Sequence, residues 1–280
     1  MNSSIVAPIV SPITVDSIVA LCRNTVAHDV VIEVVEQTSS TNLDLLARVE
    51  DMPIGAAPVL LVALQQTAGR GRAGRTWLAD GRGLTFSLAW PLRKSLEALN
   101  GLPLTVGVAI AEAIRAHGFD VALKWPNDVL LGGRKLAGVL VEAVGVSSLL
   151  RNDTWAIIGI GINIADTPAG PASIALPAID RNILVATLLI SLVEALLIFE
   201  KQGFSAFVTR WNALHAYAGQ QVNIVDEAKV VHSGHALEVD DVGRLLLNTR
   251  QGVVAVVAGD VSLRIADPSP ATKDDHATSC

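Results

Sequence analysis

The chain has 280 residues and a formal net charge of −6, and 51% of its residues are hydrophobic while 17% are charged. This composition indicates a folded protein with a sizeable buried core and argues against a largely disordered chain. The negative charge argues against a general nucleic-acid binder, which usually carries a basic face. Cys22 and Cys280 form no disulfide or metal-ligand pattern, which fits a reducing cytoplasm.

The most membrane-like segment, residues 183–199, is predicted to be a core helix. Thr187, Ser191 and Glu194 recur in it at spacings of four and three, which places them on one stripe of a helix. A spanning helix needs about 20 mainly apolar residues and tolerates charge poorly. The N-terminus has no basic region, and two prolines break its apolar run, so it does not resemble a signal peptide. We therefore predict a cytoplasmic protein without a membrane partner.

Strands and helices alternate in the first 120 residues. Thr41 and Asp44 resemble a capping box at the start of a helix, with Asp in place of Glu. Pro91 is expected to stop a strand, and Gly118 is expected to end a helix. The predicted strands are residues 30–35, 58–66 and 83–90, and the predicted helices begin near residue 41 and cover residues 104–119.

Glycines mark turns and close approaches in the second half of the chain. The Gly132–Gly133 pair predicts a hairpin turn between two strands within residues 121–144. Gly159 and Gly161 interrupt a further strand, and such glycines often mark the close approach of a ligand or another backbone. Short strands after residue 216 predict a small β-barrel. The expected division is an N-terminal arm (1–27), a main α+β domain (28–215), a β domain (216–265) and a disordered polar tail (266–280).

A glycine- and arginine-rich loop follows the second strand. Gly69, Gly71 and Gly74 permit positive φ and let backbone amides approach a ligand without interference from a Cβ. If the loop is extended, Arg70 and Arg72 project to the same side. Guanidinium groups bind phosphate or carboxylate bidentately, so the loop suits an anionic ligand. A solvated basic loop or an RNA-binding segment would explain the loop alone equally well.

A second polar segment, residues 124–135, favours an anionic ligand over a solvated loop or an RNA-binding segment. Pro126 favours an extended conformation at Trp125 and helps to end the strand, so that Asn127 and Asp128 are presented together at its edge. Asp128 is a candidate Mg²⁺ ligand beside nucleotide phosphates. Lys135 follows across the hairpin turn and is within reach of the same site as a further positive charge. Taken singly, the Asn-Asp pair also fits a turn cap, and the basic residues fit a solvated turn.

Four motifs resemble those of one enzyme family, the biotin protein ligases (biotin–acetyl-CoA-carboxylase ligases). The segments GRGRAGRTW, KWPNDVLL, RKLAGVLVE and GIGIN stand in the family's order and approximate spacing, and TSSTN and GHALEVDDVGRL also match. The resemblance covers roughly residues 30–265. It implies an α+β catalytic domain of the class II aminoacyl-tRNA-synthetase-like type, followed by a small SH3-like β-barrel.

The resemblance implies a two-step reaction. The biotin carboxylate attacks the α-phosphorus of ATP and gives biotinyl-5′-AMP and pyrophosphate, with Mg²⁺ as the cofactor. A specific lysine of a biotin carboxyl carrier protein, part of a biotin-dependent carboxylase, then attacks the mixed anhydride. Homodimers are known in the family. Cationic side chains and Mg²⁺ are expected to stabilise the charge that moves between oxyanions, and a closing loop is expected to keep water away.

The family pattern, transferred position by position, implies a set of site residues. Arg70, Lys135 and Lys124 correspond to catalytic positions, and Asp128 corresponds to the metal side. Trp77 also fits a plain core position, Gly138 a strand-packing position and Asn163 a strand cap. The implied biotin-binding residues are Ser40, Thr41, Gln66, Gly69, Arg70, Arg72, Lys135 and Gly138, and the implied ATP- or adenylate-binding residues are Arg70, Arg72, Arg75, Trp77, Asn127, Lys135 and Asn163.

Two departures from the family pattern stand out. Ala73 occupies a position where many members carry a third consecutive basic residue, which removes one charge from the loop. Bifunctional members place a winged helix-turn-helix before the catalytic domain, and fewer than 30 residues precede the first predicted strand here. We therefore expect a ligase that does not bind DNA.

Three alternatives remain at this stage. A lipoate or octanoyl protein ligase shares the catalytic fold but has different loops. A biotin-sensing module without turnover would need neither a metal ligand at Asp128 nor a phosphate-binding cation at Lys135. An RNA-binding protein would need a wider basic surface and stacking aromatic residues, whereas aromatic residues make up 4% of this chain.

Overall fold

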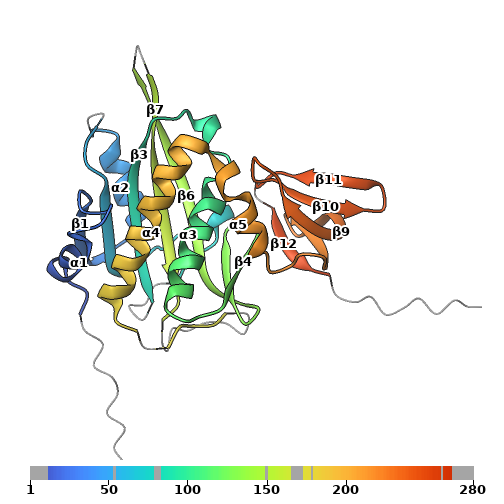
Figure 1. Ribbon diagram of the computed structural model, residues 1–280, viewed down its shortest axis with the longest axis horizontal. Helices are drawn as coiled ribbons and strands as arrows, with labels where there is room; N and C mark the ends of the chain where they lie inside the picture. Colours follow the sequence, from blue (N-terminus) through green and yellow to red (C-terminus); the bar gives the residue numbers. More distant parts are fainter. Residues whose placement is uncertain are drawn as a thin grey trace, which may run out of the picture.

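The computed structural model describes two sheets with their helices (Figure 1). It describes residues 12–52, 55–78, 83–148, 151–164, 173–177, 179–259 and 261–266. The predicted polar tail, apart from residue 266, lies outside these residues, as do the first eleven residues. The α+β class predicted from the sequence, with a small β unit at the C-terminal end, is confirmed.

The larger sheet has seven strands in the order β1-β2-β3-β7-β6-β5-β4. β1 and β2 are parallel, and every other neighbouring pair is antiparallel. Its strands are β1 (Val31–Thr38), β2 (Val59–Gln66), β3 (Leu84–Leu92), β4 (Val121–Lys124), β5 (Asp128–Leu131), β6 (Arg134–Ser148) and β7 (Arg151–Ile162).

Helices cover both faces of this sheet. α3 and α4 lie side by side across one face, with α1 beside α4, while α2 packs on the opposite face (Figure 1). The α-helices are α1 (Val15–Cys22), α2 (Thr41–Val49), α3 (Leu102–Ala116), α4 (Arg181–Gln202) and α5 (Val208–Ala213), and three short 3₁₀ helices are Arg72–Gly74, Leu96–Leu99 and Phe204–Phe207.

Alternation along the central strands separates the two faces. In β7, Ile158, Ile160 and Ile162 belong to the main core, which lies under α3 and α4. Trp155 and Ile157 belong to a smaller core beneath α2. Because successive side chains of a strand point to opposite faces, the odd-numbered positions of β7 all look toward the α2 side. The glycines of this strand therefore lie on the α2 side, where Asn42 packs over Gly159 and Trp77 packs over Gly161.

α4 is a core helix, as the sequence predicted. Leu188, Leu192 and Leu196 are fully buried, whereas Glu194 on the predicted polar stripe is exposed. Two segments, Leu96–Ala116 and Arg181–Gln202, have the length and hydropathy of membrane spans, but 72% and 61% of their most apolar windows are buried within the protein. The burial accounts for their hydrophobicity.

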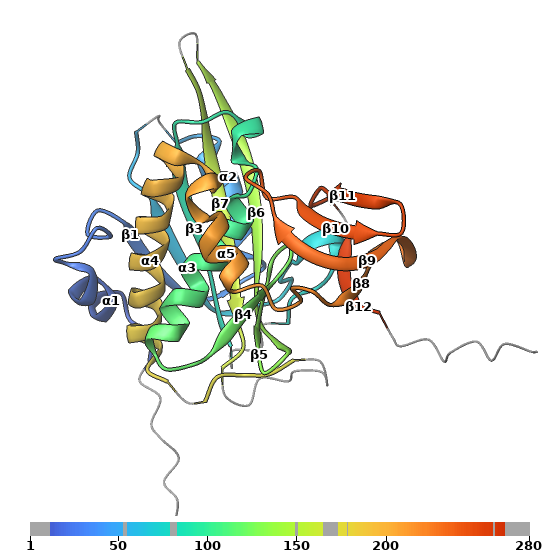
Figure 2. The same ribbon diagram turned by 45° about the vertical axis from the view of Figure 1, so that its right-hand side comes forward.

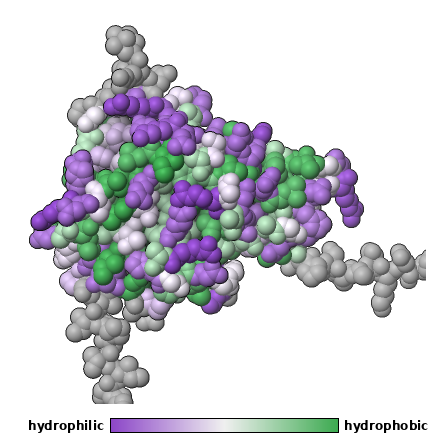
Figure 3. Space-filling model, in the orientation of Figure 1, coloured by the Kyte–Doolittle hydropathy of each residue, from purple (hydrophilic) through white to green (hydrophobic). Residues whose placement is uncertain are grey.

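The smaller sheet has five antiparallel strands in the order β11-β10-β9-β8-β12. Figure 2 brings it forward, with β12 next to the β4–β5 end of the larger sheet. Val230, Val253 and Val257 are more than half exposed on this unit, which shows apolar surface in Figure 3. Its strands are β8 (Gln221–Asp226), β9 (Lys229–Val239), β10 (Leu245–Thr249), β11 (Gly252–Val256) and β12 (Ser262–Ile265).

Three local predictions were wrong. The N-cap of α2 is Ser40, not Thr41, and its side chain makes no capping hydrogen bond, while the Asp44 carboxylate accepts a hydrogen bond from Thr38 Oγ1 at 2.6 Å. β3 continues through Pro91 to Leu92. Residues 121–144 contain three strands instead of two, because the chain also turns between β4 and β5. The expected turn at Gly132–Gly133 is present, and both glycines have positive φ.

Leu188→Ala should lower the free energy of unfolding by about 2–5 kcal/mol, because it removes a fully buried side chain and leaves a cavity. Leu197→Ala, the same change on the same helix at a side chain that is 37% exposed, should cost less than about 1 kcal/mol. Urea denaturation followed by circular dichroism measures both. Equal losses for the two variants would contradict the core role of α4.

Candidate active site

A cleft opens on the α2 side of the larger sheet, where the ends of β2, β3, β4, β5, β6 and β7 meet the glycine-arginine loop. It encloses about 900 Å³, including its open mouth. Five of the side chains that line it are cationic, and one, Asp128, is acidic. This concentration of positive charge is found in a chain whose net charge is −6. The five cationic side chains are Arg70, Arg72, Arg75, Lys124 and Lys135.

Glycines form the floor of the cleft. Gly138 of β6 and Gly161 of β7 are register partners, so their missing side chains leave one flat area in the sheet. The Trp77 ring lies on this area, and a Cβ at Gly161 would overlap the ring. The Lys135 ammonium lies over the same ring, 5.6 Å from its centroid, at a distance that permits a cation–π contact. Trp77 is therefore a wall of the cleft, and the core-position alternative is wrong.

The glycine-arginine loop is a tight hairpin, not the extended segment considered from the sequence. Gly71 N donates to Arg75 O at 2.7 Å, and Trp77 N donates to Gly69 O at 2.9 Å. Gly69 closes the base, where a Cβ would overlap the Trp77 carbonyl. Ala73 has φ 51°, in the left-handed region where a Cβ costs about 1–2 kcal/mol. The tip of the loop is thus strained at the position where the sequence departs from the family pattern.

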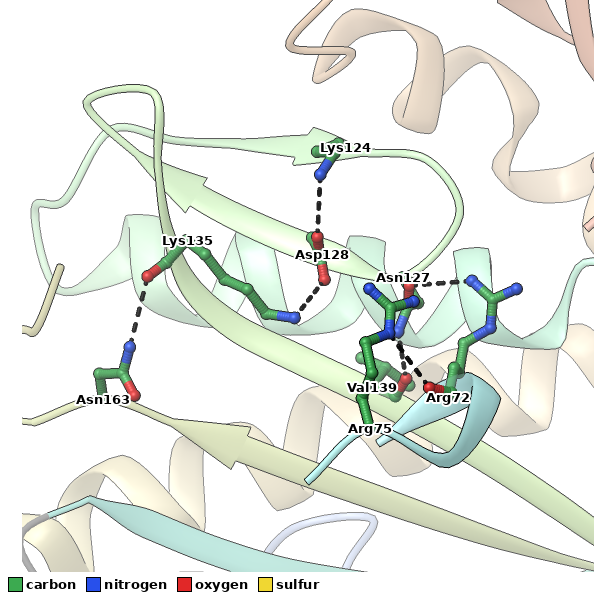
Figure 4. A network of polar contacts seen from close by, with 8 residues as sticks. All are labelled: Arg72, Arg75, Lys124, Asn127, Asp128, Lys135, Val139 and Asn163. Carbon is green, nitrogen blue, oxygen red and sulfur yellow. Dashed lines mark hydrogen bonds and ion pairs between the residues drawn. The ribbon is translucent and has the colours of Figure 1, made fainter. Parts of the chain in front are cut away.

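Asp128 lies between two lysines (Figure 4). Its Oδ1 is 2.6 Å from Lys135 Nζ, and its Oδ2 is 3.3 Å from Lys124 Nζ. Burial by itself would raise the pKa of Asp128, but the charges and hydrogen bonds of Lys135 and Lys124 outweigh it and lower the pKa below the usual value. The stabilisation from these ion pairs is present above the ordinary carboxyl pKa and is lost as the pH falls through the lowered value. The carboxylate is thus ionised at neutral pH and holds both lysines at the cleft.

The C-terminal unit closes one side of the cleft. Arg72 donates to Asn127 Oδ1 at 3.1 Å and to the carbonyl of Gly259, so the loop contacts both the turn between β4 and β5 and the segment between β11 and β12 (Figure 4 shows the Asn127 contact). Asn127 Nδ2 donates to Val139 O at 2.7 Å. Residues 261–263 also line the cleft. The site is therefore built by both sheets.

The far end of the cleft is polar and deeply buried. Thr41 N and Thr41 Oγ1 lie 2.8 and 3.0 Å from Gln66 Oε1, and Ser40 is 2% exposed. Thr41 Oγ1 also contacts Ser87 Oγ at 2.6 Å, and Ser87 donates to Asn42 Oδ1 at 2.5 Å. This end offers neutral hydrogen-bonding groups, whereas the mouth offers cations.

Most of the site residues predicted from the sequence are brought together here. Gly69 lies at the base of the loop, and Asn163 Nδ2 donates to the carbonyls of Lys135 and Ile174 at 3.3 and 3.1 Å, so Asn163 braces the start of β6. The predicted residues that line the cleft are Ser40, Thr41, Gln66, Arg70, Arg72, Arg75, Trp77, Lys124, Asn127, Asp128, Lys135 and Gly138.

The sequence did not predict the contribution of Glu142, Asn42 and Ser87, which form hydrogen bonds beside the polar end of the cleft. Glu142 of β6 pairs with Arg70 Nη2 at 3.1 Å, and its other oxygen accepts from Asn42 Nδ2 at 2.9 Å. Ser87 of β3 lies between Thr41 and Asn42. Glu142 stands an even number of residues after Gly138 in one strand, so the two-residue period places both on the same face, which was the available signal. Ser87 lies in an apolar strand and gave no such signal.

Asp128 fits a metal that arrives with a nucleotide better than a resident metal. Within the part of the chain that the structure describes, no three His, Cys, Asp or Glu side chains cluster as a metal site. Mg²⁺ is commonly held by one or two carboxylates together with substrate phosphates and water. A single ionised carboxylate beside two lysines at a cationic cleft meets that pattern only when phosphates supply further ligands.

The cleft combines a buried polar end with a cationic mouth, and comparison with known proteins places this fold and site among the protein ligases. Two family models match the chain: "Biotin/lipoate A/B protein ligase family" over residues 34–163, and "Biotin protein ligase C terminal domain" over residues 217–264. The bifunctional ligase/repressor BirA of Escherichia coli (strain K12) is 36% identical over 239 residues, which are 81% of this chain and 72% of that protein. The biotin–[acetyl-CoA-carboxylase] ligase of Mycobacterium tuberculosis is 34% identical over 246 residues, 82% of this chain and 88% of that protein.

The chain belongs to the biotin protein ligase family. Among solved structures, the biotin protein ligase of Aquifex aeolicus in complex with biotin and ATP is similar, with 29% identity and a TM-score of 0.70 over 84% of this chain and 99% of that one. Ahead of residue 31, the described residues form one short helix, α1, and no winged helix-turn-helix.

Gly161→Ala should displace the Trp77 ring and loosen the loop, because the new Cβ overlaps the indole. Trypsin cleavage after the loop arginines should accelerate at least about fivefold, which corresponds to an overpacking cost of about 1 kcal/mol or more. Gly107→Ala is the control, since a Cβ there meets Leu123 only at ordinary contact distance. Unchanged cleavage of Gly161→Ala would contradict the assigned position of Trp77.

Proposed function

We propose that the chain activates biotin with ATP and transfers it to a lysine of a biotin carboxyl carrier protein. The observation that carries the proposal is the two-ended cleft, with buried neutral hydrogen-bonding groups at one end and five cationic side chains toward the other. Biotin has the complementary form, since a neutral ureido ring is joined by an apolar chain to a carboxylate. ATP adds phosphates at the cationic end.

The head group of biotin is assigned to the buried polar end. Ser40, Thr41 and Gln66 supply hydroxyl and amide groups there, and all three line the cleft. A site built to hydrogen-bond a polar ring rejects an analogue that lacks the matching groups, because its own buried groups are then left unpaired. Gly138 is proposed to let the valeryl chain approach the backbone of β6 beside the Trp77 ring and the Lys135 side chain, which lie over this glycine.

The first chemical step is assigned to the cationic end. One carboxylate oxygen of biotin bonds to the α-phosphorus of ATP, and the bond to the bridging oxygen breaks with release of pyrophosphate. Negative charge builds up on the phosphoryl oxygens, so cations fixed in advance lower the barrier. Lys135 is held in place by Asp128, and Arg70 and Arg72 stand on the hairpin loop, so these three are proposed to stabilise that charge.

The second step uses the same cleft. The ε-amine of the acceptor lysine attacks the acyl carbon of biotinyl-5′-AMP, an amide forms, AMP leaves and one proton is released. Lys124 lies on the second oxygen of Asp128 and is proposed to support the site during transfer. The Trp77 wall and the hairpin loop are proposed to keep water from the anhydride until the acceptor arrives.

The nucleotide is assigned to the side of the cleft near β5 and the smaller sheet. Arg75, Asn127 and Trp77, which line the cleft, are proposed to contact the nucleotide, and Asn163 is proposed to lie near the adenylate through its brace on β6. Mg²⁺ is proposed to enter with ATP beside Asp128, where it would neutralise phosphate charge. Residues 28–215 are proposed as the catalytic domain and residues 216–265 as the C-terminal domain.

The remaining partners follow from this chemistry. The acceptor is proposed to be the carrier protein of a biotin-dependent carboxylase, and the place of action is proposed to be the cytoplasm, where ATP and the acceptor are available. DNA is not expected to bind, because the cationic side chains of the site lie within the cleft. The possible homodimer expected from the family is retained as a proposal.

Incubation with ATP, Mg²⁺, labelled biotin and a biotin carboxyl carrier domain should label the carrier domain. Unlabelled lipoate in about hundredfold excess should reduce this labelling by less than about twofold, because lipoate lacks the ureido groups that the polar end binds. Omission of ATP should abolish labelling. Transfer of lipoate without transfer of biotin would overturn the assignment in favour of a lipoate ligase.

A further inference from the structure

Glu142 connects the two ends of the cleft. It lies on β6, on the same face as Gly138, and its two carboxylate oxygens have different partners. Oε1 accepts from Arg70 Nη2 at 3.1 Å, and Oε2 accepts from Asn42 Nδ2 at 2.9 Å. One carboxylate therefore joins the arginine of the hairpin loop to the first turn of α2.

The contact to Asn42 continues as a chain of hydrogen bonds. Asn42 Oδ1 accepts from Ser87 Oγ at 2.5 Å, which leaves Ser87 to accept from Thr41 Oγ1 at 2.6 Å. Thr41 has a single hydroxyl proton for two neighbouring acceptors, Ser87 Oγ and Gln66 Oε1. A ligand that changes the bonding of Thr41 or Gln66 therefore changes the bonding that reaches Asn42.

The backbone leaves room for this chain at one position. A Cβ at Gly159 of β7 would overlap Asn42 Oδ1, so glycine is needed there for Asn42 to reach both Ser87 and Glu142. Asn42 and Ser87 are 3% and 0% exposed. Buried polar groups that are fully hydrogen-bonded hold a single arrangement, because any other arrangement leaves a group unpaired.

The other end of the chain is more open. The side chains of Arg70 and Glu142 are 43% and 22% exposed, so the ion pair adds little to the stability of the fold. Its geometric effect is larger. A guanidinium has five donors in a fixed plane, and a carboxylate bound at one of them orients the others. Arg70 lines the cleft, so the remaining donors are available there.

We propose that Glu142 is the positioning residue of Arg70, and that the chain through Asn42, Ser87 and Thr41 couples the biotin end of the cleft to this arginine. The proposal rests on the function proposed above, in which Arg70 stabilises charge during adenylate formation. Biotin seated against Thr41 and Gln66 then favours the arrangement that holds Arg70 in place for the phosphates of ATP.

Glu142→Gln tests this role. Glutamine keeps an acceptor oxygen for Asn42 but removes the charge that attracts Arg70. We expect kcat/KM for biotinyl-adenylate formation to fall about three- to tenfold, in line with the loss of one charge-assisted hydrogen bond, without a change in the thermal unfolding midpoint. Glu142→Asp keeps the charge and should recover part of the loss. Glu33→Gln is the matched control, because Glu33 also lies on a strand and pairs with an arginine, Arg48, away from the cleft.

A double-mutant cycle separates positioning from a general structural role. In an Arg70→Ala background, Glu142→Gln should have no further effect on kcat/KM, since the two residues act through one contact. Losses that add, or a Glu142→Gln enzyme with the wild-type rate, would overturn the proposal. Trypsin cleavage in the loop should rise about two- to fivefold in Glu142→Gln, and this assay tests the Arg70–Glu142 contact without turnover. A wild-type protein that formed no adenylate would therefore refute the proposed function, whereas unchanged trypsin cleavage would refute this inference.

Discussion

The two-residue alternation of β6 and β7 is the constraint on which the site depends. One face of these strands presents isoleucine, valine and alanine to the core under α3 and α4. The other face presents glycines to the cleft, and beyond them Glu142, which pairs with Arg70. A slip of one residue in register would exchange the two faces, so the burial of the core also fixes the floor of the site. Stability and function here come from the same pairing.

Two carboxylates hold the cationic side chains of the cleft in place above the sheet. The carboxylate of Asp128 offsets the repulsion between Lys124 and Lys135, and the cleft keeps a net positive charge within an acidic protein. A second carboxylate, that of Glu142, forms an ion pair with Arg70. Each acid orients a cation without neutralising the whole site. The cations are thus placed before ligands bind, which is the condition under which fixed charges lower a reaction barrier.

The sequence predicted the features of the fold that depend on residues close together in the chain. The strand and helix types, the hairpin at Gly132–Gly133 and the core character of α4 were predicted correctly because periodicity and turn residues encode them. The motifs also located most of the cleft residues. The tightness of the loop was missed because Ala73 in a left-handed conformation is not expected from its residue type. The contacts of Ser87 with Thr41 and of Arg72 with Gly259 depend on residues far apart in the chain, which no local pattern encodes.

The central claim is that the cationic end of the cleft drives biotinyl-adenylate formation. The most direct measurement is the yield of biotinyl-5′-AMP from a Lys135→Ala protein, compared with Lys229→Ala on β9 of the smaller sheet. We predict that Lys135→Ala lowers the yield of biotinyl-5′-AMP about a hundredfold or more, which is the usual effect of removing one fixed group that stabilises transition-state charge. The fold should stay intact by circular dichroism, and Lys229→Ala should give the wild-type yield. A normal adenylate yield from the folded Lys135→Ala protein would contradict it.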